Sequence, residues 1–292
     1  MKFAVFTVST PEYNPAETIQ LLKEVGYHGV EWRIAAPPPA AKPDNYTFER
    51  RYWSYNASTL DLDNVVASAP EIHQLTQAAG LETCSLTTYL EPHQVTLIET
   101  VLQAAKLMNC PQIRVNVPKY DESQNYRELF DRTIGQIAEL ETLACQYQVK
   151  INFEIHMGNI IPSASAAFRL VSHFDPNWIG IIFDPGNMVH EGFENYRLGV
   201  ELLGPYLAHV HVKNAVWELV ETTSANVKVW KPVWSPVKAG YADLAKLVQV
   251  LKDHRYQGYL SLEDFSNEDD TRTKIQDNLE YLKQLTAYRR RQ

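Results

Sequence analysis

Acidic side chains and a histidine stand at the ends of four short apolar runs in the second half of the chain. They are Glu154, Asp184, His211 and Glu263. Two glutamates, one aspartate and one histidine form an oxygen-rich ligand set with one nitrogen, which suits Mn²⁺, Mg²⁺ or Co²⁺ and is compatible with Zn²⁺. Three carboxylates brought together without a cation would repel one another strongly. If these residues converge, we expect them to hold one divalent metal ion.

The stretch "HVHVKN", which runs from His209 to Asn214, places a polar side chain at every second position. Because side chains alternate between the two faces of a strand, His209, His211 and Lys213 would point one way and the valines the other. His209 lies one step deeper than His211. We expect it to be a hydrogen-bonded core histidine that supports the ligand set rather than a ligand.

Eight apolar, β-branched runs alternate along the chain with longer segments of helical spacing. The runs cover residues 2–8, 29–34, 82–88, 112–117, 149–155, 179–184, 207–213 and 258–264. Strict alternation of strands and helices implies a parallel sheet. Eight such units in 292 residues predict an α/β fold, a single (β/α)₈ TIM-barrel domain over residues 1–292. The chain has no GxGxxG after the first strand and no GxxxxGK[ST], so dinucleotide and P-loop functions lack support.

In such a barrel the carboxyl ends of the strands meet around one axis, which would bring the four candidate ligands together. Other polar residues near strand ends are candidates for substrate binding: His156, Lys213, Glu31 and Arg33. For each of these four, an ion pair or hydrogen bond within the barrel mouth is an equally good explanation.

Two long segments interrupt the alternation, residues 36–64 and residues 214–240. Both follow a strand, so both would lie on the catalytic face, where long loops cover the site. The second segment holds Trp217, Trp230 and Trp234, and indoles can pack on the C–H faces of sugars. Trp217 is the stronger candidate because it lies six residues from His211. For the other two, packing of the loop onto the barrel is the better explanation.

The formal charge of −8 disfavours nucleic acid and anionic membrane surfaces, which are bound mainly by Lys and Arg. A small-molecule partner fits better. The start "MKFAVFTVST" has too short an apolar run for a signal sequence, and no stretch is long and apolar enough to span a membrane. We therefore expect a cytoplasmic protein. The sequence leaves its oligomeric state open, a homo-oligomer included.

Four motifs at consecutive strand ends resemble the sugar phosphate isomerase/epimerase superfamily, the xylose isomerase-like TIM barrels. They are "FEIHMG", "FDPGN", "HVHVKN" and "LSLEDF". The resemblance runs from the first strand to the last helix. As in tagatose and psicose 3-epimerases, it implies a metal held by a Glu, Asp, His, Glu quartet, which falls on Glu154, Asp184, His211 and Glu263.

The resemblance also implies the reaction class, an isomerase or epimerase that acts on a small sugar, polyol or keto sugar. The metal would polarise the substrate carbonyl. Glu154 and Glu263 would then be the catalytic residues that move a carbon-bound proton through an enediolate.

Two positions depart from the epimerase pattern. Epimerases usually carry a histidine where this chain has Asn187 and an arginine where it has Trp217. Both residues remain candidates for substrate binding. The departures make a dehydratase, similar to inosose or dehydroshikimate dehydratase, the main alternative, and hydroxypyruvate isomerase is another relative on the same barrel.

Two further alternatives come from other functional classes. An abasic-site endonuclease of the same superfamily would need more histidines, including one at position 187 and others after the third and fourth strands, where the sequence reads "TTYL" and "RVNVP". A non-catalytic sugar-binding relative is disfavoured by the complete carboxylate set.

The segment after the last strand, "SNEDDTRT", predicts a non-phosphorylated substrate. Barrels that bind phosphate commonly use this region and a helix N-terminus. Here Glu268, Asp269 and Asp270 would repel a phosphate dianion, although Arg272 and Lys274 could offset them.

Overall fold

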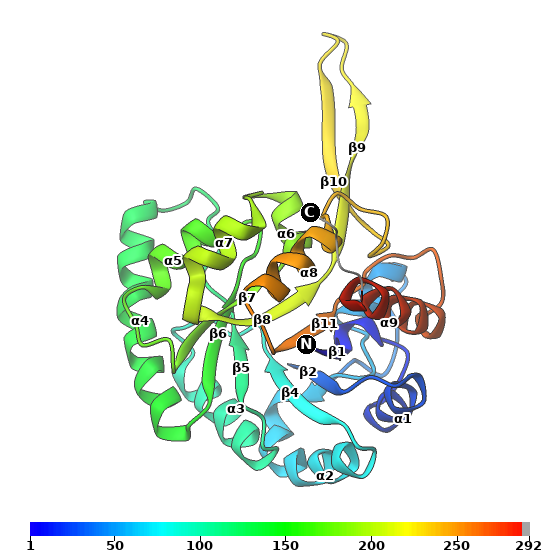
Figure 1. Cartoon of the computed structure of the whole chain (residues 1–292), viewed down its shortest axis with the longest axis vertical. Helices are drawn as coiled ribbons and strands as arrows, with labels where there is room; N and C mark the ends of the chain where they lie inside the picture. The colour runs from blue at the N-terminus through cyan, green and yellow to red at the C-terminus, as the bar shows by residue number, and fades with distance from the viewer. Residues whose placement is uncertain (288–292) are drawn as a thin grey trace.

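The computed structural model describes residues 1–287 of the chain. Its main sheet closes into a barrel (Figure 1). The strands that form the barrel are β1 (Lys2–Phe6), β2 (Gly29–Ala35), β4 (Glu82–Thr87), β5 (Gln112–Val115), β6 (Lys150–Glu154), β7 (Ile179–Phe183), β8 (Leu207–Val212) and β11 (Tyr259–Leu262). All pair in parallel, and β1 pairs with both β2 and β11, which closes the ring. The predicted (β/α)₈ barrel and its eight strands are confirmed.

The strands are continuous apolar runs in the sequence because both of their faces are covered by other parts of the protein. In β7, for example, all five residues of "IGIIF" are buried. Helices pack around the outside of the barrel (Figure 1), so the outward-facing side chains of the strands lie in a second core layer.

Residues 1–287 contain nine α-helices. They are α1 (Pro15–Val25), α2 (Val65–Ala78), α3 (Val95–Leu107), α4 (Tyr126–Tyr147), α5 (Ala164–Val171), α6 (Pro185–His190), α7 (Tyr196–Leu203), α8 (Leu244–Asp253) and α9 (Thr271–Ala287). Helix α1 starts with a capping box between Asn14 and Glu17 and ends at Gly26, whose φ of 96° is left-handed. No described helix combines the length and apolar character needed to cross a membrane.

The segment 214–240 is not an irregular loop. It contains an antiparallel hairpin of β9 (Asn214–Thr222) and β10 (Lys228–Ser235), which projects from the carboxyl-terminal end of the barrel (Figure 1). Its base is buried, with Asn214, Ala215 and Ser235 packed into the barrel mouth. Its outer part is exposed, so this segment covers the site with its base alone.

The segment 36–64 is mostly irregular. It contains two 3₁₀ turns, Phe48–Tyr52 and Leu62–Asn64, and the two-residue strand β3 (Leu60–Asp61), which pairs with β2. Tyr52 is buried and its hydroxyl donates to the Ser266 carbonyl at 2.9 Å, which ties this segment to the far end of the chain.

Candidate metal centre and substrate cavity

Four strands place the predicted ligands together at the carboxyl end of the barrel. Glu154 ends β6, Asp184 follows β7, His211 lies in β8 and Glu263 follows β11. All four are at most 3% exposed. One donor atom from each lies within 4.8 Å of the donor atoms of the other three. The cluster expected from the sequence is therefore present.

The ring of His211 turns its Nδ1 atom into this cluster. Nδ1 lies 2.9 Å from Glu154 Oε1, 3.4 Å from Glu263 Oε2 and 3.6 Å from Asp184 Oδ2. The Phe6 ring stacks on the imidazole with centroids 5.7 Å apart, which limits the orientations open to the histidine. Nδ1 is thus the nitrogen available to a metal ion.

Lys213 enters the cluster from the end of β8. Its Nζ donates to Glu263 Oε2 at 2.5 Å and lies 2.9 Å from Asp184 Oδ2. Helix α6 approaches this lysine closely, because a Cβ on Gly186 would lie 2.8 Å from the Lys213 carbonyl carbon. The absence of a side chain at position 186 lets the helix and the lysine share this space.

Arg114 is a member of the site that the sequence reading missed. Its guanidinium is buried, lies 3.1 Å from Glu154 Oε2 and donates to Asn116 Oδ1 at 2.6 Å. The signal was available, because an arginine inside the apolar run "QIRV" must find a partner once that run is buried.

These positive charges set the pKa values of the two glutamates. Burial alone would raise the pKa of Glu154, but Arg114 and His211 hold it well below its usual range. For Glu263 burial is likewise outweighed, chiefly by Lys213, and its pKa is lowered. Both carboxyls are therefore ionised at neutral pH.

The pKa values of Asp184 and His211 are raised instead of lowered. Burial raises the pKa of Asp184, although Lys213 opposes the shift. Burial would lower the pKa of His211, but Glu31 and Glu154 raise it well above its usual value. The cluster is a tightly paired set of charges in which each ion depends on its neighbours.

The donor set fits a divalent metal ion. Ligand atoms of Mn²⁺, Mg²⁺ or Zn²⁺ lie about 2.0–2.2 Å from the metal, so two ligands of one ion stand up to about 4.4 Å apart. The cluster meets this spacing with small adjustments. Asp184 Oδ2 is fully buried and receives no hydrogen bond of regular geometry from the described residues. Lys213 Nζ lies 2.9 Å from that oxygen, and a metal ion would be a second positive partner for it.

A cavity of about 490 Å³ opens above the cluster. Glu154, Glu263, Lys213 and His156 all line it. The lining includes three aromatic residues, Trp53, Trp234 and Phe265, and a set of polar residues, Tyr89, Glu91, Arg114, Asn116, Lys119 and Asn159. Apolar surface combined with a few hydrogen-bonding groups is typical of sites for small polar molecules.

His156 presents an acceptor to this cavity. Its Nδ1 lies 2.7 Å from the Met157 carbonyl oxygen, which can only accept, so Nδ1 carries the proton. Burial lowers the pKa of His156 and keeps the ring neutral. Its Nε2 can therefore accept a hydrogen bond from a hydroxyl group.

Asn187 touches the cluster directly. Its Nδ2 donates to Glu154 Oε1 at 3.1 Å and to the Ile155 carbonyl at 3.0 Å, and its backbone N–H donates to Asp184 Oδ1 at 2.9 Å. Asn187 holds two candidate ligands in place.

Three other candidates do not line the cavity. Glu31 lies deeper in the barrel, where it contacts His211. Arg33 lies behind the cavity lining, with its Nε donating to the Tyr89 hydroxyl at 3.3 Å. The indole of Trp217 donates to the Val189 carbonyl at 2.8 Å, at the end of α6. Trp234, not Trp217, is the hairpin tryptophan that faces the cavity.

Known proteins share this fold and parts of this sequence. Over 161 residues the chain is 26% identical to inosose dehydratase from Clostridium perfringens, and the match covers 52% of this chain and 53% of the relative. The chain thus spans about half the length of the curated relatives that it matches. Among solved structures, the IOLI protein "with a binding zinc atom" has a TM-score of 0.72 at 15% identity and covers 98% of each chain.

A second solved structure, D-psicose 3-epimerase in the presence of D-fructose, has a TM-score of 0.71 at 11% identity and covers 99% of this chain and 100% of that one. At such low identity, these two structures bear on the fold alone. A family model for the xylose isomerase-like TIM barrel matches residues 19–285. The chain therefore belongs to the xylose isomerase-like TIM barrel family.

Proposed function

We propose that this protein is a divalent-metal-dependent isomerase or epimerase. Its substrate is a small, non-phosphorylated sugar, polyol or keto sugar from which it removes a proton next to a carbonyl group. The observation that carries the proposal is that Glu154 and Glu263 belong to the metal-binding cluster and also line the cavity. Two ionised carboxylates thus meet the substrate at the point where a cation would hold it.

The roles of the side chains follow from their positions. A bound divalent ion supplies Lewis-acid polarisation of a carbonyl oxygen. Glu154 and Glu263 are ionised, so either can accept a proton from the carbon beside that carbonyl and the other can return one. Lys213 and Arg114 place positive charge beside these carboxylates and stabilise negative charge that develops on substrate oxygens.

The residues that line the cavity can orient the substrate. Trp234, Trp53 and Phe265 offer apolar surfaces to C–H groups. His156 accepts from a substrate hydroxyl, and Lys213 donates to an oxygen near Glu263. This combination favours a molecule that carries several hydroxyls and also has C–H groups.

The environment of α9 supports a substrate without phosphate. Asp270 accepts from the Thr273 N–H at 3.0 Å, so a carboxylate already caps the first turn of α9. Lys274 is buried, and its Nζ donates to the Ser266 carbonyl at 2.8 Å and to the Tyr52 hydroxyl at 3.0 Å. Arg272 pairs with Glu24 at 2.8 Å. The two cations of this segment, Arg272 and Lys274, are therefore engaged elsewhere.

A dehydratase is the second candidate. The same proton abstraction leads to loss of water when a hydroxyl leaves from the next carbon. The inosose dehydratases in the sequence comparison favour this outcome. Asn187 weakens the epimerase assignment, because its amide donates to Glu154 and cannot act as an acid or base as a histidine could.

The test combines metal analysis with proton exchange in heavy water. Purified protein soaked with Mn²⁺, Co²⁺ or Zn²⁺ should retain one ion per chain. Ketoses and keto-inositols incubated with it should take up deuterium at the carbon next to the carbonyl. An isomerase or epimerase returns a rearranged sugar, whereas a dehydratase releases an unsaturated product.

Variants separate metal binding from chemistry. Glu263→Gln should reduce turnover by about 10²–10⁴-fold even with metal bound. Glu139→Gln, on the exposed surface of α4 and outside the cavity, is the control and should leave turnover nearly unchanged. The absence of stoichiometric metal would refute the proposal, and full turnover in metal-loaded Glu263→Gln would remove this residue from the reaction.

A further inference from the structure

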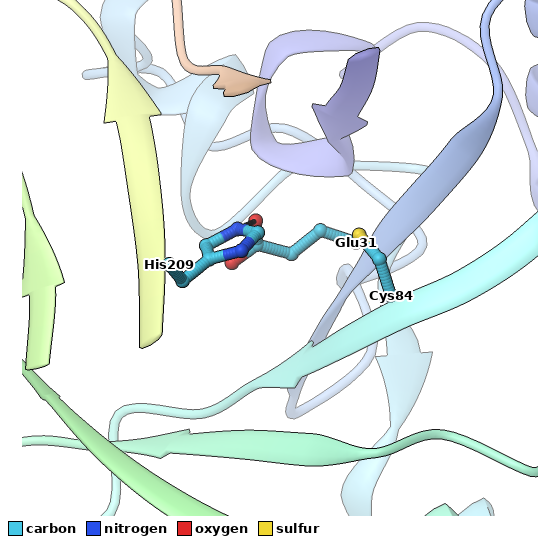
Figure 2. A group of neighbouring side chains, drawn as sticks. All are labelled: Glu31, Cys84 and His209. Atoms are coloured by element: carbon cyan, nitrogen blue, oxygen red, sulfur yellow. Dashed lines mark hydrogen bonds and ion pairs between the residues drawn. The ribbon is translucent and has the colours of Figure 1, made fainter. Parts of the chain in front are cut away.

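A chain of buried polar side chains runs through the barrel interior beneath the metal cluster. At its centre is Glu31 of β2, which is 0% exposed. Figure 2 shows Glu31 and His209 reaching toward each other across the barrel from β2 and β8, with Cys84 of β4 beside them. A buried carboxylate needs several donors, and those donors come from strands on different sides of the barrel.

Glu31 has four such donors. Its Oε2 lies 2.9 Å from His209 Nε2 and accepts from Ser261 Oγ at 2.6 Å. Its Oε1 lies 3.1 Å from His211 Nε2 and accepts a short hydrogen bond from Thr87 Oγ1. Both carboxylate oxygens are therefore satisfied, and both histidines contact the same group.

The hydrogen-bond partners determine the tautomer of His209. Gln112 donates its amide Nε2 to the Cys84 carbonyl at 3.1 Å, and its Oε1 accepts from Asn152 at 2.8 Å. These two contacts orient the amide. Its NH₂ group lies 3.2 Å from His209 Nδ1, so Nδ1 accepts and Nε2 donates to Glu31.

The same reasoning applies to His211. The oxygens of Glu31 can only accept from an imidazole, so His211 Nε2 is the donor in their 3.1 Å contact. That contact leaves His211 Nδ1 as the metal-facing nitrogen, which is the atom that points at Glu154, Asp184 and Glu263.

We infer that Glu31 is the positioning residue of the metal centre. Gln112 orients His209, and His209 donates to Glu31. Glu31 in turn keeps the proton on His211 Nε2, so that His211 Nδ1 faces the metal. Glu31 does not touch the substrate cavity and acts only through His211. This inference rests on the metal site of the proposed function.

The trio of Glu31, Cys84 and His209 could be mistaken for a second metal site, because one donor atom from each lies within 4.8 Å of the others. The acceptor oxygens of Glu31 and both nitrogens of His209 are already used in hydrogen bonds. We therefore assign the trio no ion, and Cys84 supplies a matched control.

The first experiment measures Co²⁺ affinity by competition with a chromophoric chelator, together with the visible spectrum of the Co²⁺ complex. Loss of a partner that orients a ligating histidine typically costs about 10–100-fold in metal affinity. Glu31→Gln should show a loss of this size and an altered Co²⁺ spectrum. Cys84→Ala changes packing in the same trio, but the Cys84 thiol is not among the hydrogen-bond partners of His209 and His211 given above, so this variant should bind Co²⁺ as the natural protein does.

A second pair of variants covers the case in which Glu31→Gln does not fold. His209→Gln can still donate to Glu31 and should retain most of the affinity, whereas His209→Leu cannot donate and should lose affinity. Equal affinity in the two variants would overturn the inference.

Nitrogen-15 NMR of the Zn²⁺-loaded protein gives an independent readout. His211 should appear protonated on Nε2 and coordinated through Nδ1, and the reverse assignment would contradict the inference. If the natural protein binds no metal, the proposed function fails. If it binds metal and Glu31→Gln binds equally well, only the positioning role fails.

Discussion

Lys213 brings a positive charge to the same place where the proposed metal ion would bind. Its ammonium lies 2.5 Å from Glu263 Oε2, 2.9 Å from Asp184 Oδ2 and 4.0 Å from Glu154 Oε1. Together with Arg114 and His211, it offsets the repulsion among three buried carboxylates. The lysine is therefore an internal competitor of the metal as well as a donor to substrate.

Replacement of Lys213 should thus have two opposite effects. A unit charge about 4 Å away is worth on the order of 4 kcal/mol at an effective dielectric constant near 20, so Lys213→Met should tighten metal binding by roughly tenfold or more. Turnover should fall, because a donor to the substrate is lost. Calorimetric titration with Mn²⁺ and steady-state kinetics measure the two effects. Lys213→Arg keeps the charge, and weaker metal binding in Lys213→Met would contradict this account.

His190 should make stability depend on pH. It packs on Trp234 with ring centroids 4.1 Å apart, and burial lowers its pKa to about 4. An unfolded histidine has a pKa of about 6.5, so between these values the unfolded chain binds more protons than the folded one. His190 therefore adds to the free energy of unfolding above about pH 6.5, and this contribution is lost as the pH falls toward 4.

His190→Gln should flatten this dependence. Urea denaturation at about pH 7 and about pH 5 should give a smaller difference in unfolding free energy for the variant than for the natural protein. His93 has an exposed side chain, so His93→Gln is the matched control and should leave the difference unchanged. An unchanged difference in His190→Gln would show that other groups cause the acid sensitivity.

Among the elements, α6 depends most on close packing against the site. It begins directly after Asp184, whose side chain accepts from the Asn187 N–H at 2.9 Å, and its Gly186 lies against Lys213. This short helix therefore sets the position of one candidate ligand and restricts the lysine that neighbours it.

Gly186→Ala should destabilise the protein by about 1–3 kcal/mol, the usual cost of forcing extra atoms into a packed site. It should also weaken metal binding, since Lys213 or Asp184 must move. Gly135 lies within α4 with nothing within 4 Å of an added Cβ, so Gly135→Ala should stabilise by about 0.5–1 kcal/mol. Chemical denaturation measures both, and equal effects would contradict the packing argument.

The hairpin of β9 and β10 divides into a buried base and an exposed outer part. Trp234 lies at the base and packs on His190 and Phe265, while Trp230 is 50% exposed.

Trp234→Ser should raise the KM for the substrate and lower the free energy of unfolding. Trp230→Ser should change the unfolding free energy by less than about 0.5 kcal/mol. Thermal melts and kinetics compare the two, and a loss of activity in Trp230→Ser would assign the outer part a role in the reaction.

At the scale of the whole molecule, the metal should stabilise the fold, because its ligands come from four strands of the barrel. A ligand at 100 times its Kd adds about 2.7 kcal/mol to the free energy of unfolding. Melting temperature should rise with added Mn²⁺ and fall with a chelator. Asp184→Asn should reduce the rise. A melting temperature that changes with neither added metal nor chelator would argue against a metal site in the barrel.

The sequence predicts the barrel well because the signal is repeated. Eight apolar runs at regular intervals, each followed by a helical pattern, leave few alternative folds, and all eight form strands. Once the barrel is predicted, the candidate ligands at its strand ends are predicted to lie together without any further assumption. The hairpin was predicted as a loop, because charged residues and Pro232 interrupt its apolar pattern.

The walls of the cavity were harder to predict, because distance along the chain is a poor guide to distance in space. Trp217 lies six residues from His211, but β9 leaves the barrel and carries it away at about 3.3 Å per residue. Trp234 is farther along the chain, and β10 returns it to the mouth, where it pairs with Ala215. Arg114 meets Glu154 from the neighbouring strand, and Glu31 of β2 meets His209 of β8 across the barrel interior, and a single sequence does not reveal either contact.

Closure of the ring by β1 and β11 has a consequence for synthesis of the protein on the ribosome. The first strand lacks one of its two neighbours until the eleventh has emerged, and at about 5–20 residues per second this interval is roughly 10 to 50 seconds. During that time β1 is an open edge, able to pair with other nascent chains. Glu263 emerges just after this strand and follows the other three candidate ligands along the chain, so the proposed metal ion would gain its fourth ligand only once β11 can close the ring.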